Sequence, residues 1–150
     1  MATFNLKDII QTDRQSLQSL TADVTIEGMH FTIGYLSRAA TAEMARRCVT
    51  HRWNASRSSR EATLDYAKLA KELSDAVVKG WRGVTPSKLA KFLPMKRALT
   101  PEELETEIPF DQENLRVLLE NVTGLESALQ DAANDASLFQ PATLEAELGN

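Results

Sequence analysis

The sequence predicts a mainly α-helical protein with one short β-hairpin near its N-terminus, a small single-domain helical assembly factor. Three observations support this fold class. Apolar residues recur at helical spacing through much of the chain after residue 40, strand-like alternation is confined to residues 24–36, and capping residues precede several of the apolar runs. The length of 150 residues suits one domain. We expect an N-terminal arm (1–20), a helical domain (21–139) and a flexible C-terminal tail (140–150).

The β-hairpin is expected at the start of the helical domain. Val24 and Ile26 flank a threonine, and residues 31–36 alternate apolar side chains with threonine and glycine. Glu27-Gly28-Met29 supplies the turn. Because a lone hairpin is marginally stable in water, we expect this one to pack on helices or to pair with another chain.

Two helices are expected after the hairpin. Thr41 can cap a first helix that runs to about Arg52, and residues 54–59 form a polar connection. A second helix is expected from about Arg60 to Lys79, since its apolar residues at i, i+3, i+4, i+7 and i+11 share one face. Gly80 is well placed to end it.

The next segment contains two short helices by the same reasoning. Thr85-Pro86 and Thr100-Pro101 each place a capping hydroxyl before a proline, which is a common helix opening. These signals predict helices near residues 87–92 and 102–105.

The C-terminal third gives the clearest helix signals. Asp111 caps one helix, with Phe110 and Leu115 at the two positions of a hydrophobic staple. A last amphipathic helix follows the break at Gly124 and extends to Phe139.

No residue pattern supports an enzyme. His30 and His51 lie far apart and have no carboxylate or thiol at ligand spacing. Cys48 has no catalytic-cysteine signature around it and suits a small buried core residue. No glycine-rich phosphate loop is present. We therefore expect no enzymatic activity, no metal and no cofactor.

The chain also has no signal for a membrane or an oxidising compartment. No stretch approaches the ~18 apolar residues of a membrane span, and the first residues lack the layout of a signal peptide. A single cysteine cannot form an internal disulfide. We expect a cytoplasmic protein without a membrane partner.

Charge is unevenly distributed along the chain. Residues 1–100 carry 16 Lys or Arg against 9 Asp or Glu, whereas residues 101–150 carry Arg116 alone against 12 acids. Such polarity can align copies head to tail or attract one charged partner. It can equally be neutralised within a single subunit, and both interpretations stay open.

Arginines gather between residues 38 and 60, interleaved with Trp53. Arginines beside an aromatic can clamp phosphates and stack bases. The whole chain is acidic, however, with a pI of about 5.2, which argues against nucleic acid as a partner. We expect a protein-facing role for these arginines, and we include Arg46, Arg47 and Arg52 among the interface residues.

Trp81 is the other large feature of the sequence. It is either a core anchor at a helix end or an interface anchor, since tryptophan is enriched in binding hot spots. Both interpretations hold if the core is completed only when copies associate. The expected apolar interface residues are Trp81, Val84, Phe110 and Leu115.

The order of two signatures resembles the tail assembly chaperones of long-tailed bacteriophages. The first signature is Trp81-Arg82-Gly83-Val84, and the second runs from Ile108 to Leu119 (Ile-Pro-Phe-Asp-Gln-Glu-Asn-Leu-Arg-Val-Leu-Leu). An alanine-rich segment that ends at Phe139 adds to the likeness. In such chaperones a short turn usually joins the two signatures, whereas here residues 85–107 lie between them.

The resemblance implies a non-enzymatic assembly factor of the infected host's cytoplasm. Proteins of this family coat the helical tape measure protein, help to recruit the tail tube protein, and leave as the tube polymerises. It also implies a homo-oligomer and, in many phages, a longer form made by frameshifting. Two other classes stay open: a virion structural protein of the tail or head completion, and a small nucleic-acid-binding regulator that uses Arg46–Arg60.

Overall fold

The computed structural model describes residues 5–140, so the expected tail, apart from Gln140, lies outside the described residues. The fold is α+β. Helices make up 46% and strands 21% of the described residues, and the strands form two antiparallel sheets of three and two strands. The expected mainly α fold with a single hairpin is therefore wrong, because three further segments are strands.

The larger sheet begins with the expected hairpin, which is confirmed. Its strands are β1 (Thr21–Ile26) and β2 (Met29–Gly34). Both turn residues have positive φ, 52° at Glu27 and 78° at Gly28, the backbone that a two-residue hairpin turn requires. The third strand, β5 (Val78–Arg82), pairs antiparallel with β2 and gives the order β1-β2-β5.

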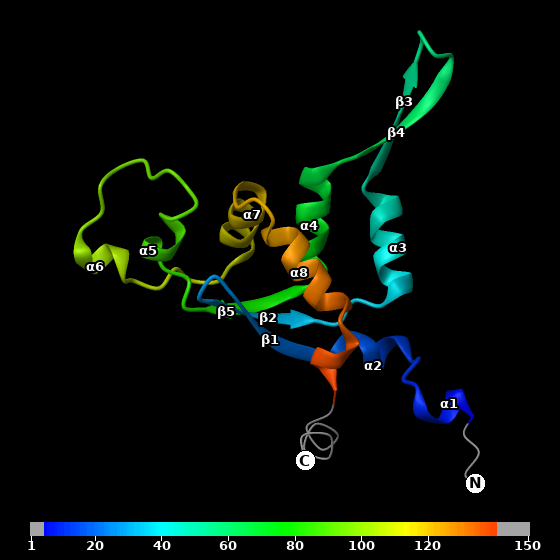
Figure 1. Ribbon diagram of the computed structural model, residues 1–150, viewed down its shortest axis with the longest axis horizontal. Helices are drawn as coiled ribbons and strands as arrows, with labels where there is room; N and C mark the ends of the chain where they lie inside the picture. The colour runs from blue at the N-terminus through cyan, green and yellow to red at the C-terminus, as the bar shows by residue number, and fades with distance from the viewer. Residues whose placement is uncertain (1–4, 141–150) are drawn as a thin grey trace.

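Helices cover one side of this sheet (Figure 1). The longer ones are α3 (Arg38–Arg47), α4 (Tyr66–Ala76), α7 (Gln112–Asn121) and α8 (Leu125–Asn134). Their apolar faces meet β2 in one core, in which Phe31, Leu73, Leu115 and Leu129 are completely buried. Two short helices, α1 (Leu6–Ile9) and α2 (Arg14–Ser19), precede the sheet within the expected N-terminal arm.

The first two expected helices contain strands, which accounts for the error in fold class. The helix expected to reach Arg52 ends at Arg47, and β3 (Val49–Asn54) follows. The helix expected over residues 60–79 divides into β4 (Ser59–Leu64), α4 and β5. The helical periodicity was real only from Tyr66 to Val77, and Asp65 caps that shorter helix by accepting a hydrogen bond from the Lys68 amide. Gly80 lies inside β5 and ends no helix.

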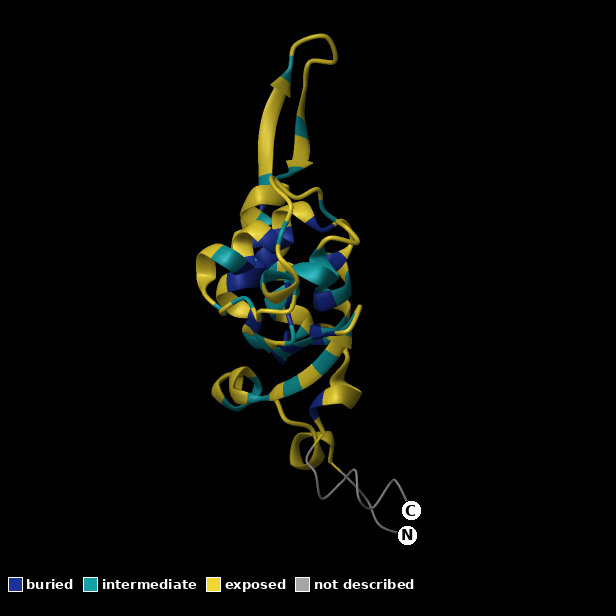
Figure 2. Ribbon diagram, turned by 90° about the vertical axis from the view of Figure 1, so that its left-hand side faces the viewer, coloured by how far each residue is buried: buried dark blue, intermediate teal, exposed yellow. Residues whose placement is uncertain are grey.

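β3 and β4 form the second sheet, which stands away from the body of the molecule. We call residues 49–64 the projecting hairpin. It rises beyond α3 and α4 with no third strand beside it (Figure 1), and most of its residues are exposed and none is buried (Figure 2). The polar connection expected at residues 54–59 is its turn.

The remaining elements lie close to their expected positions. The segment between the two signatures contains α5 (Pro86–Leu89) and α6 (Pro101–Leu104), and Thr100 with Glu103 forms a capping box at the latter. The Asp111 cap of α7 is confirmed by its hydrogen bond from the Asn114 amide, 2.7 Å long. The last helix is shorter than expected, because α8 ends at Asn134 and a 3-10 turn, η1 (Ala136–Phe139), follows.

Candidate partner-binding surfaces

Trp81 joins the two signatures on which the family resemblance depends. It lies on β5, half-buried, and its Nε1 donates a hydrogen bond of 2.8 Å to the carbonyl oxygen of Ile108. Its ring meets Phe110 edge-on at a centroid distance of 5.2 Å and Phe31 at 6.3 Å. Aromatic pairs in this geometry stabilise a structure beyond the area they bury. Residues 27 positions apart are thus fixed in one cluster.

The segment between the signatures is a loop whose two ends are held together. The Ile108 amide donates to the Val84 carbonyl at 2.8 Å, and the Gly83 amide donates to the Glu107 carboxylate. Lys88 adds a second attachment, because its ammonium group donates to the carbonyls of Gly28 (2.8 Å) and Gly83 (2.7 Å). The insertion of residues 85–107 therefore leaves the two signatures in contact.

Two of the four expected apolar interface residues are core residues. Val84 is 1% exposed and Leu115 is completely buried, so neither presents a side chain at the surface of this subunit. Trp81 and Phe110 are half-buried and pack on that core. The fold brings the four residues close to one another, and their main contacts are with the core of this subunit.

Beside this cluster lies a pocket of about 150 Å³ between the inserted loop and α7. Trp81 and Asn114 line it together with six aliphatic residues: Val84, Leu89, Leu93, Ile108, Val117 and Leu118. Val117 is 53% exposed, which is unusual for a large apolar residue and makes one wall of the pocket reachable from solvent. A space of this order accepts one apolar side chain of aromatic-ring size. No residue pattern predicts this pocket, because its walls come from three separate segments.

The three arginines expected at an interface do not form one patch. Arg46 and Arg47 lie in the last turn of α3, where their positive charge interacts favourably with the negative end of the helix dipole. Arg47 is engaged within the subunit: its Nη2 lies 3.0 Å from Oε2 of Glu72, and this hydrogen bond raises the pKa of Arg47 above its ordinary value. Arg52 lies on β3 in the projecting hairpin, and its side chain is exposed.

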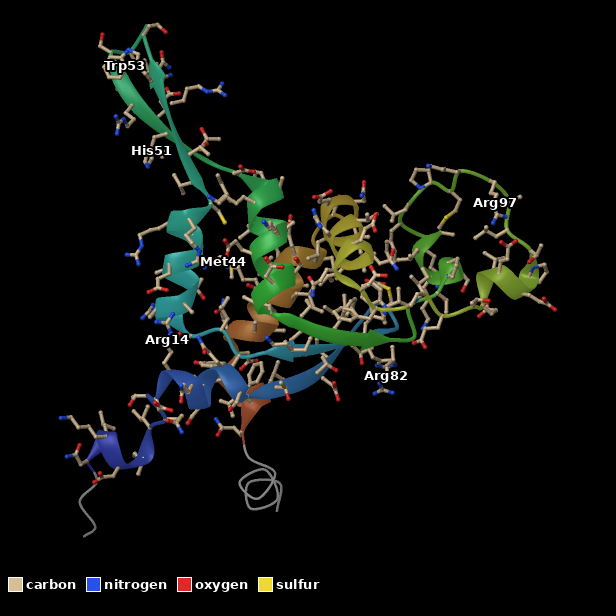
Figure 3. The ribbon with its side chains drawn as sticks, turned by 180° about the vertical axis from the view of Figure 1, so that it is seen from behind. Arg14, Met44, His51, Trp53, Arg82 and Arg97 are labelled. Carbon is tan, nitrogen blue, oxygen red and sulfur yellow. The ribbon has the colours of Figure 1, made fainter. Side chains whose placement is uncertain are left out.

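The projecting hairpin is the surface feature that sequence reasoning missed. The strand register places Trp53 opposite Arg60 and His51 opposite Ala62, so these four residues share one face. Trp53 is 64% exposed and lies near the end of the hairpin, with His51 closer to the body (Figure 3). The Asn54-Ala55-Ser56 sequence is a turn signal that could have revealed the hairpin, since Asn54 Oδ1 accepts hydrogen bonds from the Ser56 amide and hydroxyl.

Outside these surfaces, we find no arrangement of side chains for metal binding or thiol chemistry in residues 5–140. No three His, Cys, Asp or Glu side chains gather there in a way that could hold a metal ion. Cys48 is completely buried, and burial raises the pKa of its thiol, which disfavours the reactive thiolate. Among the described helices, none has both the length and the apolar character needed to cross a membrane.

Fold and surfaces together define an α+β protein with an aromatic cluster, a small apolar pocket and an exposed basic hairpin. No protein-family model, curated protein or solved structure was found to match the chain. The likeness to the tail assembly chaperones thus depends on the resemblance in sequence alone.

Proposed function

We propose that this protein is a non-enzymatic tail assembly chaperone of a long-tailed bacteriophage, acting in the cytoplasm of the infected host. The observation that supports it is the contact between the two signatures. Trp81 binds the Ile108 carbonyl and packs on Phe110, although 23 residues, Thr85 to Glu107, are inserted between the signatures. If the two signatures act together in the family, they must lie in contact in this chain, as they do.

In this proposal the partner is the helical tape measure protein, held through the pocket beside α7. A helical partner is recognised when an apolar side chain of its exposed stripe enters a hydrophobic recess. The pocket offers aliphatic walls, one amide at Asn114 and an exposed rim at Val117. Its small volume limits each copy to about one such side chain. Several weak contacts along a long partner suit a chaperone that has to be displaced when tail tube subunits arrive.

The test is co-expression with the cognate tape measure protein. Val117→Asp places a charge at the pocket rim without removing a buried side chain, so the fold is retained. We expect the tape measure protein to stay soluble with the unchanged chain and to precipitate with Val117→Asp. The measurement is the fraction of tape measure protein in the supernatant after centrifugation.

Ser127→Asp is the matched control. It adds the same single negative charge to an exposed position of the neighbouring helix α8 and should leave the soluble fraction unchanged. A tape measure protein that is equally soluble without this chain would contradict the proposal. Stable incorporation of the chain into purified virions would also contradict it and favour a structural role.

A further inference from the structure

We propose that the projecting hairpin is a binding site for the phosphate backbone of duplex DNA, which it would enter as a β-ribbon. This role lies beyond the chaperone function and does not depend on it. The major groove of B-DNA, ~12 Å wide, admits a two-stranded ribbon of this kind. The strands β3 and β4 form such a ribbon, with six paired positions from Val49–Leu64 at its base to Asn54–Ser59 at its turn.

Positive charge lies on both faces of the ribbon and at its tip. Arg60 shares a face with Trp53, Arg52 lies on the opposite face, and Arg57 lies in the turn. Neither Arg52 nor Arg60 forms an ion pair with any other described residue. A ribbon within a groove has a phosphate strand on each side, so arginines on both faces match that geometry.

The ribbon's one acid is already engaged. Glu61 accepts a 2.7 Å hydrogen bond from Asn54 Nδ2 and lies 3.7 Å from the Arg57 guanidinium. Besides His51, the other polar residues of the ribbon have hydroxyl or amide side chains, which also contact phosphate oxygens in protein–DNA complexes: Thr50, Asn54, Ser56, Ser58, Ser59 and Thr63. The sequence of the ribbon therefore contains the residue types that bind a nucleic-acid backbone.

The acidity of the whole chain does not oppose this role. Six residues of antiparallel strand extend about 17–20 Å. The Debye length at physiological ionic strength is about 8 Å, so the tip lies roughly two screening lengths from the acidic body. The net charge of −4 belongs to the molecule as a whole, whereas the ribbon carries three arginines against Glu61 alone. DNA approaching the tip therefore meets a locally positive surface.

The experiment measures fluorescence anisotropy of a labelled 24-base-pair DNA duplex titrated with the full chain. Three neutralised phosphates give a slope of log K against log salt near −2.7, or about a 40-fold loss of affinity between 50 and 200 mM salt. The triple variant Arg52→Gln, Arg57→Gln, Arg60→Gln should abolish this binding. Single-stranded DNA and RNA of the same length should bind more weakly, since neither offers the B-form major groove.

A matched control changes three exposed arginines outside the ribbon, Arg38, Arg82 and Arg116, to glutamine. It has the same net charge as the ribbon variant and should bind DNA as the unchanged chain does. A third variant, Arg52→Lys, Arg57→Lys, Arg60→Lys, preserves the charge. It should retain the salt slope even if the substitutions distort the two strands.

Two results would overturn the proposal. One is DNA affinity that is equal in the ribbon variant and in the control. The other is self-association, measured by sedimentation without DNA, that the ribbon variant loses. The ribbon would then bind the acidic surface of a second copy.

Discussion

Two tryptophans of this chain occupy opposite environments. Trp81 is half-buried, bonded to the Ile108 carbonyl and in contact with two phenylalanines, whereas Trp53 is 64% exposed. Sequence reasoning could identify Trp81 as an anchor, but it could not name the carbonyl that Trp81 binds. That contact joins elements 27 residues apart, and no local pattern encodes it.

Trp81→Phe should destabilise the protein by about 1–2 kcal/mol, because it removes the indole N–H from the Ile108 carbonyl and leaves a gap in the cluster. Urea unfolding followed by circular dichroism measures the change. Trp53→Phe makes the same substitution at an exposed position and should change the free energy of unfolding by less than about 0.5 kcal/mol. Equal effects at the two positions would mean that the cluster around Trp81 does not hold the fold.

Glu103 should titrate far below an ordinary glutamate. Its carboxylate receives two hydrogen bonds from the Arg97 guanidinium, of 3.2 and 2.6 Å, and one from the Thr100 amide. These bonds lower its pKa from 4.5 to about 2. Because the pKa is lower in the folded state, the ion pair contributes to stability above about pH 4.5 and loses that contribution as the pH falls towards 2.

A carbon-13 NMR titration of the Glu103 carboxyl measures this pKa directly. Arg97→Gln should move the midpoint back towards its usual range. The pair is exposed, so its effect on global stability is small. A midpoint near 4.5 in the unchanged protein would show that the Arg97–Glu103 pair does not persist in solution.

At the scale of elements, some signals that act within one turn were predictable, as was the local pairing of β1 with β2, whereas the other strand pairings were not. Asp111 and Thr100 cap helices where their sequence context predicts caps, and the first hairpin follows its alternation. The strands of segment 49–64 are not predictable from alternation, because both faces of the ribbon are exposed and no hydrophobic pattern marks them. Sequence periodicity predicts a helix end where the short strand β5 lies, since the pairing of β5 with β2 is a long-range contact.

The projecting hairpin should be dispensable for folding of the body. Val49 and Leu64 are paired across its base, so an Asn-Gly turn can replace residues 50–63 and close the chain without strain. The shortened protein should keep its far-ultraviolet helical signal and unfold within about 1 kcal/mol of the full chain. Urea unfolding monitored by circular dichroism measures both. Loss of cooperative unfolding would show that the hairpin packs on the body more closely than its exposure indicates.

At the scale of the whole molecule, the segregation of charge was evident in the sequence but its place in space was not. Apart from Arg38, which begins α3, the arginines gathered between residues 38 and 60 separate into the end of α3, where Arg47 pairs with Glu72, and the distant ribbon. The apolar pocket is likewise a property of the assembled fold, because it lies where a loop, a strand and α7 meet. Such sites need tertiary contacts before any residue pattern identifies them.

The closed base of the inserted loop has a consequence for how the chain can change. Since residues 84 and 108 are bonded directly, and Lys88, Leu89 and Leu93 already contact the body, the body depends little on the part of the loop that follows Leu93. Each doubling of a flexible loop's length adds only about 0.6 kcal/mol of closure entropy. Related chains could therefore lengthen or shorten the loop after Leu93 while the pocket keeps its walls and Trp81 and Phe110 keep their contact. The length of this loop can thus differ between related chains while the rest of the fold stays the same.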